Sequence, residues 1–219
     1  INIITKSHQN IEHSEVGGGV GSFDTYNLWS NQSANWQNWQ LAINLEYIKS
    51  KGFDGLLERD GQTVIDETGD ALFANGTLPF DPVNASFAPG YLNLEHNSLD
   101  LWFSASHPWL DIDVGVQERW DVGSGQGFVE ALDPIGKVGG YRHIVQAAMK
   151  PVTLAENLQL EGKVYYYGSS QQTDELYLLL PPGTVFGAFP DGLIGGPETK
   201  EYTTKLETKL TYDGLNDHQ

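Results

Sequence analysis

The chain has 219 residues, and its 12 Lys and Arg against 29 Asp and Glu give a formal net charge of −17. A hydrophobic content of 39%, with 11% aromatic residues, is typical of a folded globular protein rather than a disordered one. The charge excludes nucleic acid as a natural partner, because affinity for phosphates depends on neutralising them with cations.

The chain contains no cysteine, which excludes disulfides and thiolate metal sites. It begins with Ile1 and has no apolar run long enough to cross a bilayer as a helix. These features predict a mature secreted or cell-surface (extracellular) protein, associated with the outer surface but without membrane insertion.

In chain order, residues 1–14 are expected to form an edge strand or a loose arm. The glycine run at 17–21 predicts a flexible break, so that a loose N-terminal arm extends to about residue 21. Apolar and polar residues alternate from Leu41 to Tyr47, which favours a half-buried strand. Turn formers dominate residues 52–90, with no convincing long helix.

Residues 91–103 are interpreted as a hairpin that turns at His96-Asn97-Ser98, with its second strand continuing to Ala105. Short strands are also expected later in the chain, at 110–116, 141–149, 158–167, 175–180 and 201–212. Many short strands at this spacing predict an all-β fold, an antiparallel β-sandwich or barrel-like single domain (1–219) with long loops.

His107-Pro108-Trp109 is the most informative motif, because it places an imidazole and an indole two residues apart at the exit of an expected strand. Neutral imidazole is a common ligand for copper and zinc. His143 lies near the start of another expected strand and is the first choice for a second ligand, with His96 next. Core packing of Trp109 with a solvated His107 is the alternative interpretation.

Two carboxylate clusters are further candidates. Asp111 and Asp113 share one face of a strand, where they would bind a hard cation or support an imidazole. The acidic segment at 66–70 is placed in a turn and suggests calcium, although it lacks the ligand order of an EF-hand. Solvated acidic loops explain both clusters equally simply.

Aromatic residues allow two other functions. Trp29, Trp36 and Trp39 fit a surface structural or glycan-binding β-sandwich module, such as a filament subunit or adhesin. A secreted polysaccharide-active enzyme would use a Tyr or carboxylate pair, but nothing in the sequence fixes such a geometry.

The His-x-Trp motif in an acidic, cysteine-free chain resembles the copper-repressible, surface-associated copper-binding proteins of methanotrophic bacteria, the MopE/CorA family. In that family two histidines and a kynurenine made from tryptophan hold one Cu(I). The resemblance implies a non-enzymatic copper-acquisition protein with His107 as a ligand and Trp109 as the kynurenine precursor. The second histidine is not carried over, because no second motif matches.

Overall fold

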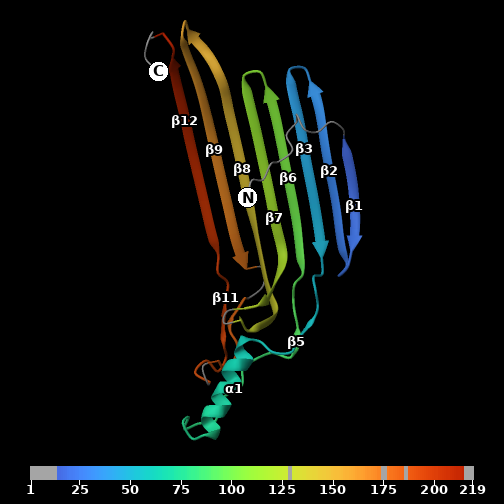
Figure 1. Cartoon of the computed structure of the whole chain (residues 1–219), viewed down its shortest axis with the longest axis vertical. Coiled ribbons are helices and arrows are strands. Elements are labelled where there is room, and N and C mark those ends of the chain that lie inside the picture. Colours follow the sequence, from blue (N-terminus) through green and yellow to red (C-terminus); the bar gives the residue numbers. More distant parts are fainter. Residues whose placement is uncertain (1–13, 128–129, 174–176, 185–186, 215–219) are drawn as a thin grey trace.

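The computed structural model describes residues 14–127, 130–173, 177–184 and 187–214. One antiparallel sheet of eight strands dominates it (Figure 1), in the order β1-β2-β3-β6-β7-β8-β9-β12. The strands are β1 (Glu15–Gly21), β2 (Thr25–Trp36), β3 (Trp39–Ser50), β6 (His96–His107), β7 (Leu110–Gln126), β8 (Leu132–Ala155), β9 (Leu158–Thr173) and β12 (Thr199–Tyr212).

A small cap region lies beyond one end of this sheet, at the bottom of Figure 1. It contains the helix α1 (Gly61–Ala74) and two short antiparallel pairs. The pairs are β4 (Leu56–Leu57) with β5 (Gly90–Tyr91), and β10 (Tyr177–Leu180) with β11 (Leu193–Gly195). The predicted all-β antiparallel class is therefore confirmed, with a large sheet that is open at β1 and β12.

The two ends of the sheet are built differently. At the end away from the cap, two-residue turns join β2 to β3, β6 to β7 and β8 to β9. We call this the turn end. The long connections that follow β3 and β9 lie at the other end, and they carry the cap region.

Several expected strands are confirmed, because alternation reports which residues face the same way. Residues 41–47 lie within β3, 110–116 within β7, 141–149 within β8, 158–167 within β9 and 201–212 within β12. The strand expected at 175–180 is present as β10 from Tyr177. Its first residues, like most of the expected arm at 1–13, lie outside the described part.

The expected flexible break at residues 17–21 is wrong, because this glycine run belongs to the outer strand β1. Bulky neighbours explain the glycines. A Cβ at Gly17 would lie 2.2 Å from the ring of Trp29, and one at Gly18 would lie 2.9 Å from Leu28. Large side chains on β2 occupy the space where β1 side chains would stand.

The hairpin expected at 91–103 is also wrong. His96 begins β6 and pairs with Ser50 of β3, so 96–98 is strand rather than turn. Tyr91 pairs instead with Leu56 in the cap region. The two expected strands are close in sequence, which favoured a local hairpin. In the structure β6 instead pairs with β3 over eleven positions.

The expectation of no helix fails at α1. Asp60 caps this helix: its side chain accepts a hydrogen bond from the Thr63 N–H, while the Thr63 hydroxyl accepts one from the Asp60 N–H. This reciprocal arrangement is a capping box. An Asp-Gly pair is a frequent turn signal, and the same residues here start a helix.

The register divides the large sheet into two unlike faces, since paired residues project to the same side. The apolar face carries rows such as Ile43, Phe103, Val114, Val145 and Tyr166. The polar face carries rows such as Glu46, Asp100, Gln117, Arg142 and Ser169. Within the described chain, no helix is long and apolar enough to span a membrane.

Candidate functional site

His107 and Trp109 lie together at the turn end of the sheet. Their ring centroids are 5.3 Å apart in an edge-to-face arrangement, and Trp39 approaches His107 from the other side at 4.8 Å. The Nδ1 atom of His107 is buried and has no hydrogen-bond partner among the described residues. Trp109 is 52% exposed, so it does not plug a core.

The other two expected ligands lie far from this pair. His107 pairs with Leu110 of β7, which in turn pairs with Met149 of β8. His143 lies six residues from Met149 on β8. At the rise of an antiparallel strand this separation is about 20 Å. His96 is at the opposite end of β6, eleven residues from His107, or about 37 Å away.

Each of these two histidines has a local contact of its own. The ring of His143 stacks on Tyr141, with centroids 4.5 Å apart and planes 18° apart. His96 Nδ1 lies 3.3 Å from the backbone oxygen of Leu94. Among residues 14–127, 130–173, 177–184 and 187–214, no group of three or more His, Asp or Glu side chains is placed to hold a metal ion. Copper ligation stays a prediction, and the described conformation brings only His107 and Trp109 together.

Asp111 and Asp113 share a face, as their spacing predicts, but it is the polar face. Asp111 pairs with Ser106 and Asp113 with Ser104, whereas His107 projects to the apolar face. Asp111 accepts a hydrogen bond from the Ser106 hydroxyl at 2.6 Å and forms an ion pair with Lys150 at 3.0 Å. These carboxylates therefore cannot support the imidazole of His107 from where they stand.

The segment at 66–70, expected in a turn, lies inside α1. Its buried Asp66 accepts hydrogen bonds from the N–H groups of Ala85 and Ser86, both at 2.8 Å, and from the Gln62 amide at 2.7 Å. These contacts tie α1 to the strand-free segment that follows it. Asp66 thus has a structural task, and calcium binding stays a prediction.

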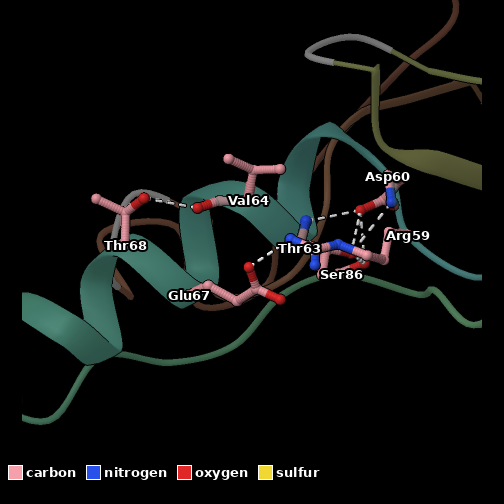
Figure 2. Close-up of polar contacts among 7 residues, drawn as sticks. All are labelled: Arg59, Asp60, Thr63, Val64, Glu67, Thr68 and Ser86. Carbon is pink, nitrogen blue, oxygen red and sulfur yellow. Dashed lines mark hydrogen bonds and ion pairs between the residues drawn. The ribbon is translucent and has the colours of Figure 1, made fainter.

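Asp60 is the most highly connected carboxylate of the cap region. Its oxygens accept hydrogen bonds from the Thr63 and Ser86 side chains, shown in Figure 2, and from the backbone N–H of Leu132, each at 2.7 Å. Burial raises the pKa of Asp60, but these hydrogen bonds together outweigh it and hold the pKa below its ordinary value. Asp60 therefore joins the start of α1 to the start of β8.

The apolar face of the sheet is uncovered. Fifteen large apolar side chains on it are at least 37% exposed: Val16, Val20, Tyr26, Leu28, Trp36, Ile43, Leu45, Val145, Val152, Val164, Tyr166, Tyr202, Leu206, Leu210 and Tyr212. Trp29 of β2 is similarly exposed, but it pairs with Glu46 and therefore projects to the polar face.

The buried core is correspondingly small. Buried apolar residues in the described chain are few, namely Ala42, Ala85, Ala105, Ala131, Leu132 and Leu178. Exposed apolar patches of this extent are typical of surfaces that contact another protein, a ligand or a membrane.

Aromatic residues border the apolar face at both ends. Trp36, Trp39 and Trp109 lie at the turn end. Tyr26, Tyr47, Trp120 and Tyr141 lie toward the cap end. From Trp39 to Tyr47 is eight residues of β3, or about 27 Å.

The rows between these borders carry no Asp, Glu, Lys or Arg on the apolar face. These charge-free rows begin with the cross-strand row that contains Leu45, Leu101, Val116 and His143. They continue through every second row of the sheet to the turn end. Charged residues of the same strands, such as Glu46, Asp113 and Lys163, project to the polar face. Sequence reasoning identified alternation only at residues 41–47 and missed the face, because the face follows from the register that joins the strands.

Comparisons with known proteins find no matching family model, no matching curated protein and no matching solved structure. The resemblance to the methanotroph copper proteins therefore stays an expectation, and the functional argument rests on the geometry of the two faces.

Proposed function

We propose that this chain forms a membrane-embedded sheet whose apolar face contacts lipid hydrocarbon and whose polar face lines a hydrophilic interior. The observation that carries the proposal is a charge-free band of the apolar face, which lies between aromatic borders at the turn end and toward the cap end. Tyr and Trp concentrate at the two membrane–water interfaces, where an amphipathic ring contacts both phases.

The dimensions support a membrane as the second phase. The apolar band of membrane-crossing strands is about 25 Å tall, and such strands are about 9–11 residues long. Here the aromatic borders are about 27 Å apart along β3, which has 12 residues, and at a strand tilt of about 40° this spans about 21 Å of the membrane. Short turns at one end and long connections at the other are also typical of membrane sheets.

Backbone hydrogen bonding adds a requirement. Every N–H and C=O inside hydrocarbon has to be paired within the protein. The inner six strands satisfy this requirement with neighbours on both sides, but β1 and β12 each have one neighbour. The proposal therefore requires further strands to pair with both outer strands in the membrane.

This proposal differs from the sequence-based expectation of a surface protein without membrane insertion. That expectation considered apolar runs of helix length, whereas a strand needs apolar residues only at alternate positions. It also gives the exposed aromatic residues a task that neither core packing nor copper ligation supplies.

The test compares two arginine substitutions at adjacent positions of β8. Val145 lies in the middle row of the apolar face, and Gln146 lies on the polar face beside Asp113. The chain is refolded with phosphatidylcholine vesicles and separated by flotation. We expect the wild type and Gln146→Arg to float with the vesicles, and Val145→Arg to lose most of its insertion, because an arginine at mid-membrane costs about 2–4 kcal/mol.

Two results would contradict the proposal. One is wild-type protein that stays in the aqueous fraction as a folded monomer. The other is a water-soluble dimer that Val145→Arg dissociates and Gln146→Arg does not, since a second copy would then cover the apolar face.

A further inference from the structure

The polar face is hollowed between two tryptophans. A groove of about 440 Å³ crosses β2, β3, β6 and β7, and Trp29 and Trp102 stand at its two sides. Between them it is lined by polar side chains, including Asn44, Glu46, Asp100 and Gln117. All these residues project to the face opposite the one assigned to lipid, so the groove goes beyond the function proposed above.

Both indole rings are held in place by glycines of neighbouring strands. A Cβ at Gly17 would lie 2.2 Å from the ring of Trp29, and a Cβ at Gly115 would lie 2.2 Å from the ring of Trp102. Each ring therefore packs onto bare backbone. The two tryptophans are two strands apart, about 10 Å across the sheet and about 7 Å along it.

The polar groups between the rings provide both hydrogen-bond donors and acceptors. The Asn44 amide makes no side-chain hydrogen bond within the described residues. Glu46 accepts one hydrogen bond from Asn27, at 3.0 Å, and keeps further acceptor capacity. The Gln117 carbonyl accepts from Arg142 at 3.3 Å, which leaves the NH₂ group of Gln117 to donate.

Charge in the groove disfavours an anionic ligand. Asp100 is neutralised by Arg119, whose Nη2 atom lies 3.0 and 2.8 Å from the two carboxylate oxygens, while Glu46 forms no ion pair with the described residues. A small cation held by aromatic rings needs them to converge on one point. These two rings are instead spaced along the groove, which suits an extended ligand.

A second hollow lengthens the same path. It has a volume of about 470 Å³, shares Gln117 with the first, and continues over β8 and β9 past Arg142 and Ser169. The polar face thus has a trough that crosses from β2 to β9.

We propose that this trough binds a neutral oligosaccharide, with sugar rings stacked on Trp29 and Trp102. Sugar hydroxyls donate to carboxylates and accept from amides, and the apolar C–H faces of sugar rings pack on aromatic rings. Specific ligand sites combine such aromatic walls with a few placed polar groups.

The test measures binding of maltohexaose and cellohexaose to the full chain, by calorimetry and tryptophan fluorescence. We expect saturable binding of at least one of them, and a loss of affinity of about tenfold or more in Trp102→Ala. Phe80→Ala is the control, because it removes an exposed aromatic ring in the segment that follows α1, outside the groove, and will leave the affinity unchanged.

Two further variants keep the test decisive if Trp102→Ala does not fold. Asn44→Ala removes a polar group from the groove without emptying a packed site, and Gly115→Ala displaces the Trp102 ring while retaining it. Both are expected to weaken binding. Absence of saturation at millimolar oligosaccharide, equal binding by all variants, or saturable binding of tetramethylammonium instead would overturn the proposal. Vesicle flotation is measured on the same samples, so failure of the oligosaccharide site is distinguishable from failure of the membrane proposal.

Discussion

At the scale of single residues, Asp60 concentrates more hydrogen bonds than the other carboxylates described in the cap region. It accepts from a helix N-terminus, from Ser86 and from Leu132, three segments far apart in the sequence. A local signal, the Asp-x-x-Thr spacing, was present in the sequence, but its two distant partners were not predictable from it. Its consequences for stability are therefore properties of the fold.

Asp60→Asn is predicted to destabilise the cap region by about 1–3 kcal/mol, because charged hydrogen bonds are lost around a buried group. The pH dependence follows from the lowered pKa of Asp60. Its stabilisation is fully present above the unfolded value of about 3.9 and is lost as pH falls toward the folded pKa. Amide hydrogen exchange of α1 measures both effects. Asp81→Asn, at an exposed site, is the control, and an equal effect there would contradict the assignment.

His107 is the residue at which the copper hypothesis can be tested. That hypothesis predicts that His107→Ala abolishes stoichiometric Cu(I) binding, measured by metal analysis of the loaded and dialysed chain. Since His143 and His96 are about 20 and 37 Å from it along the strands, His143→Ala and His96→Ala are expected to leave the stoichiometry unchanged. Copper retained in His107→Ala would place the metal elsewhere.

At the scale of elements, the alternation of residues 41–47 made β3 predictable, and the Gly, Pro, Asn and Asp residues between short runs made parts of β7, β8, β9 and β12 predictable. The glycine strand β1 was not predictable, since its packing is supplied by Trp29 and Leu28 of β2. The helix α1 was missed because Asp60-Gly61 and Thr68-Gly69-Asp70 are typical turn formers, although both lie at or within the helix. The positions of His143 and His96 relative to His107 were not predictable for a related reason: which strands pair, and in which register, is non-local information.

The turn between β8 and β9 allows a test at this scale. Asn157 has a φ of 63°, a left-handed conformation that Asn tolerates and β-branched residues do not. Asn157→Val is expected to lower the free energy of unfolding by about 1–2 kcal/mol, measured by urea denaturation of the vesicle-bound chain. Asn157→Gly should be close to neutral. Equal destabilisation by both substitutions would show that the side chain of Asn157, rather than its backbone, matters.

At the scale of the whole molecule, the proposed function places the apolar face of the sheet against lipid and the polar face against water. A sequence reader sees that each strand has an apolar side and concludes that a core exists. The described residues include few buried apolar side chains to form one, so the same pattern fits the external apolar phase proposed above. What covers the face is a question that alternation within single strands does not address.

The absence of cysteine makes this question directly measurable, because a single introduced cysteine carries a spin label at one defined place. Two adjacent pairs sample opposite faces: Val145 and Gln146 in β8, and Leu206 and Lys205 in β12. In phosphatidylcholine vesicles, labels at Val145 and Leu206 are expected to collide preferentially with dissolved oxygen, which concentrates in hydrocarbon. Labels at Gln146 and Lys205 are expected to collide preferentially with a water-soluble nickel chelate.

Equal nickel accessibility on both faces would mean that water covers the apolar face. Exclusion of both reagents at Val145, together with spin–spin broadening between chains, would mean that a second copy covers it.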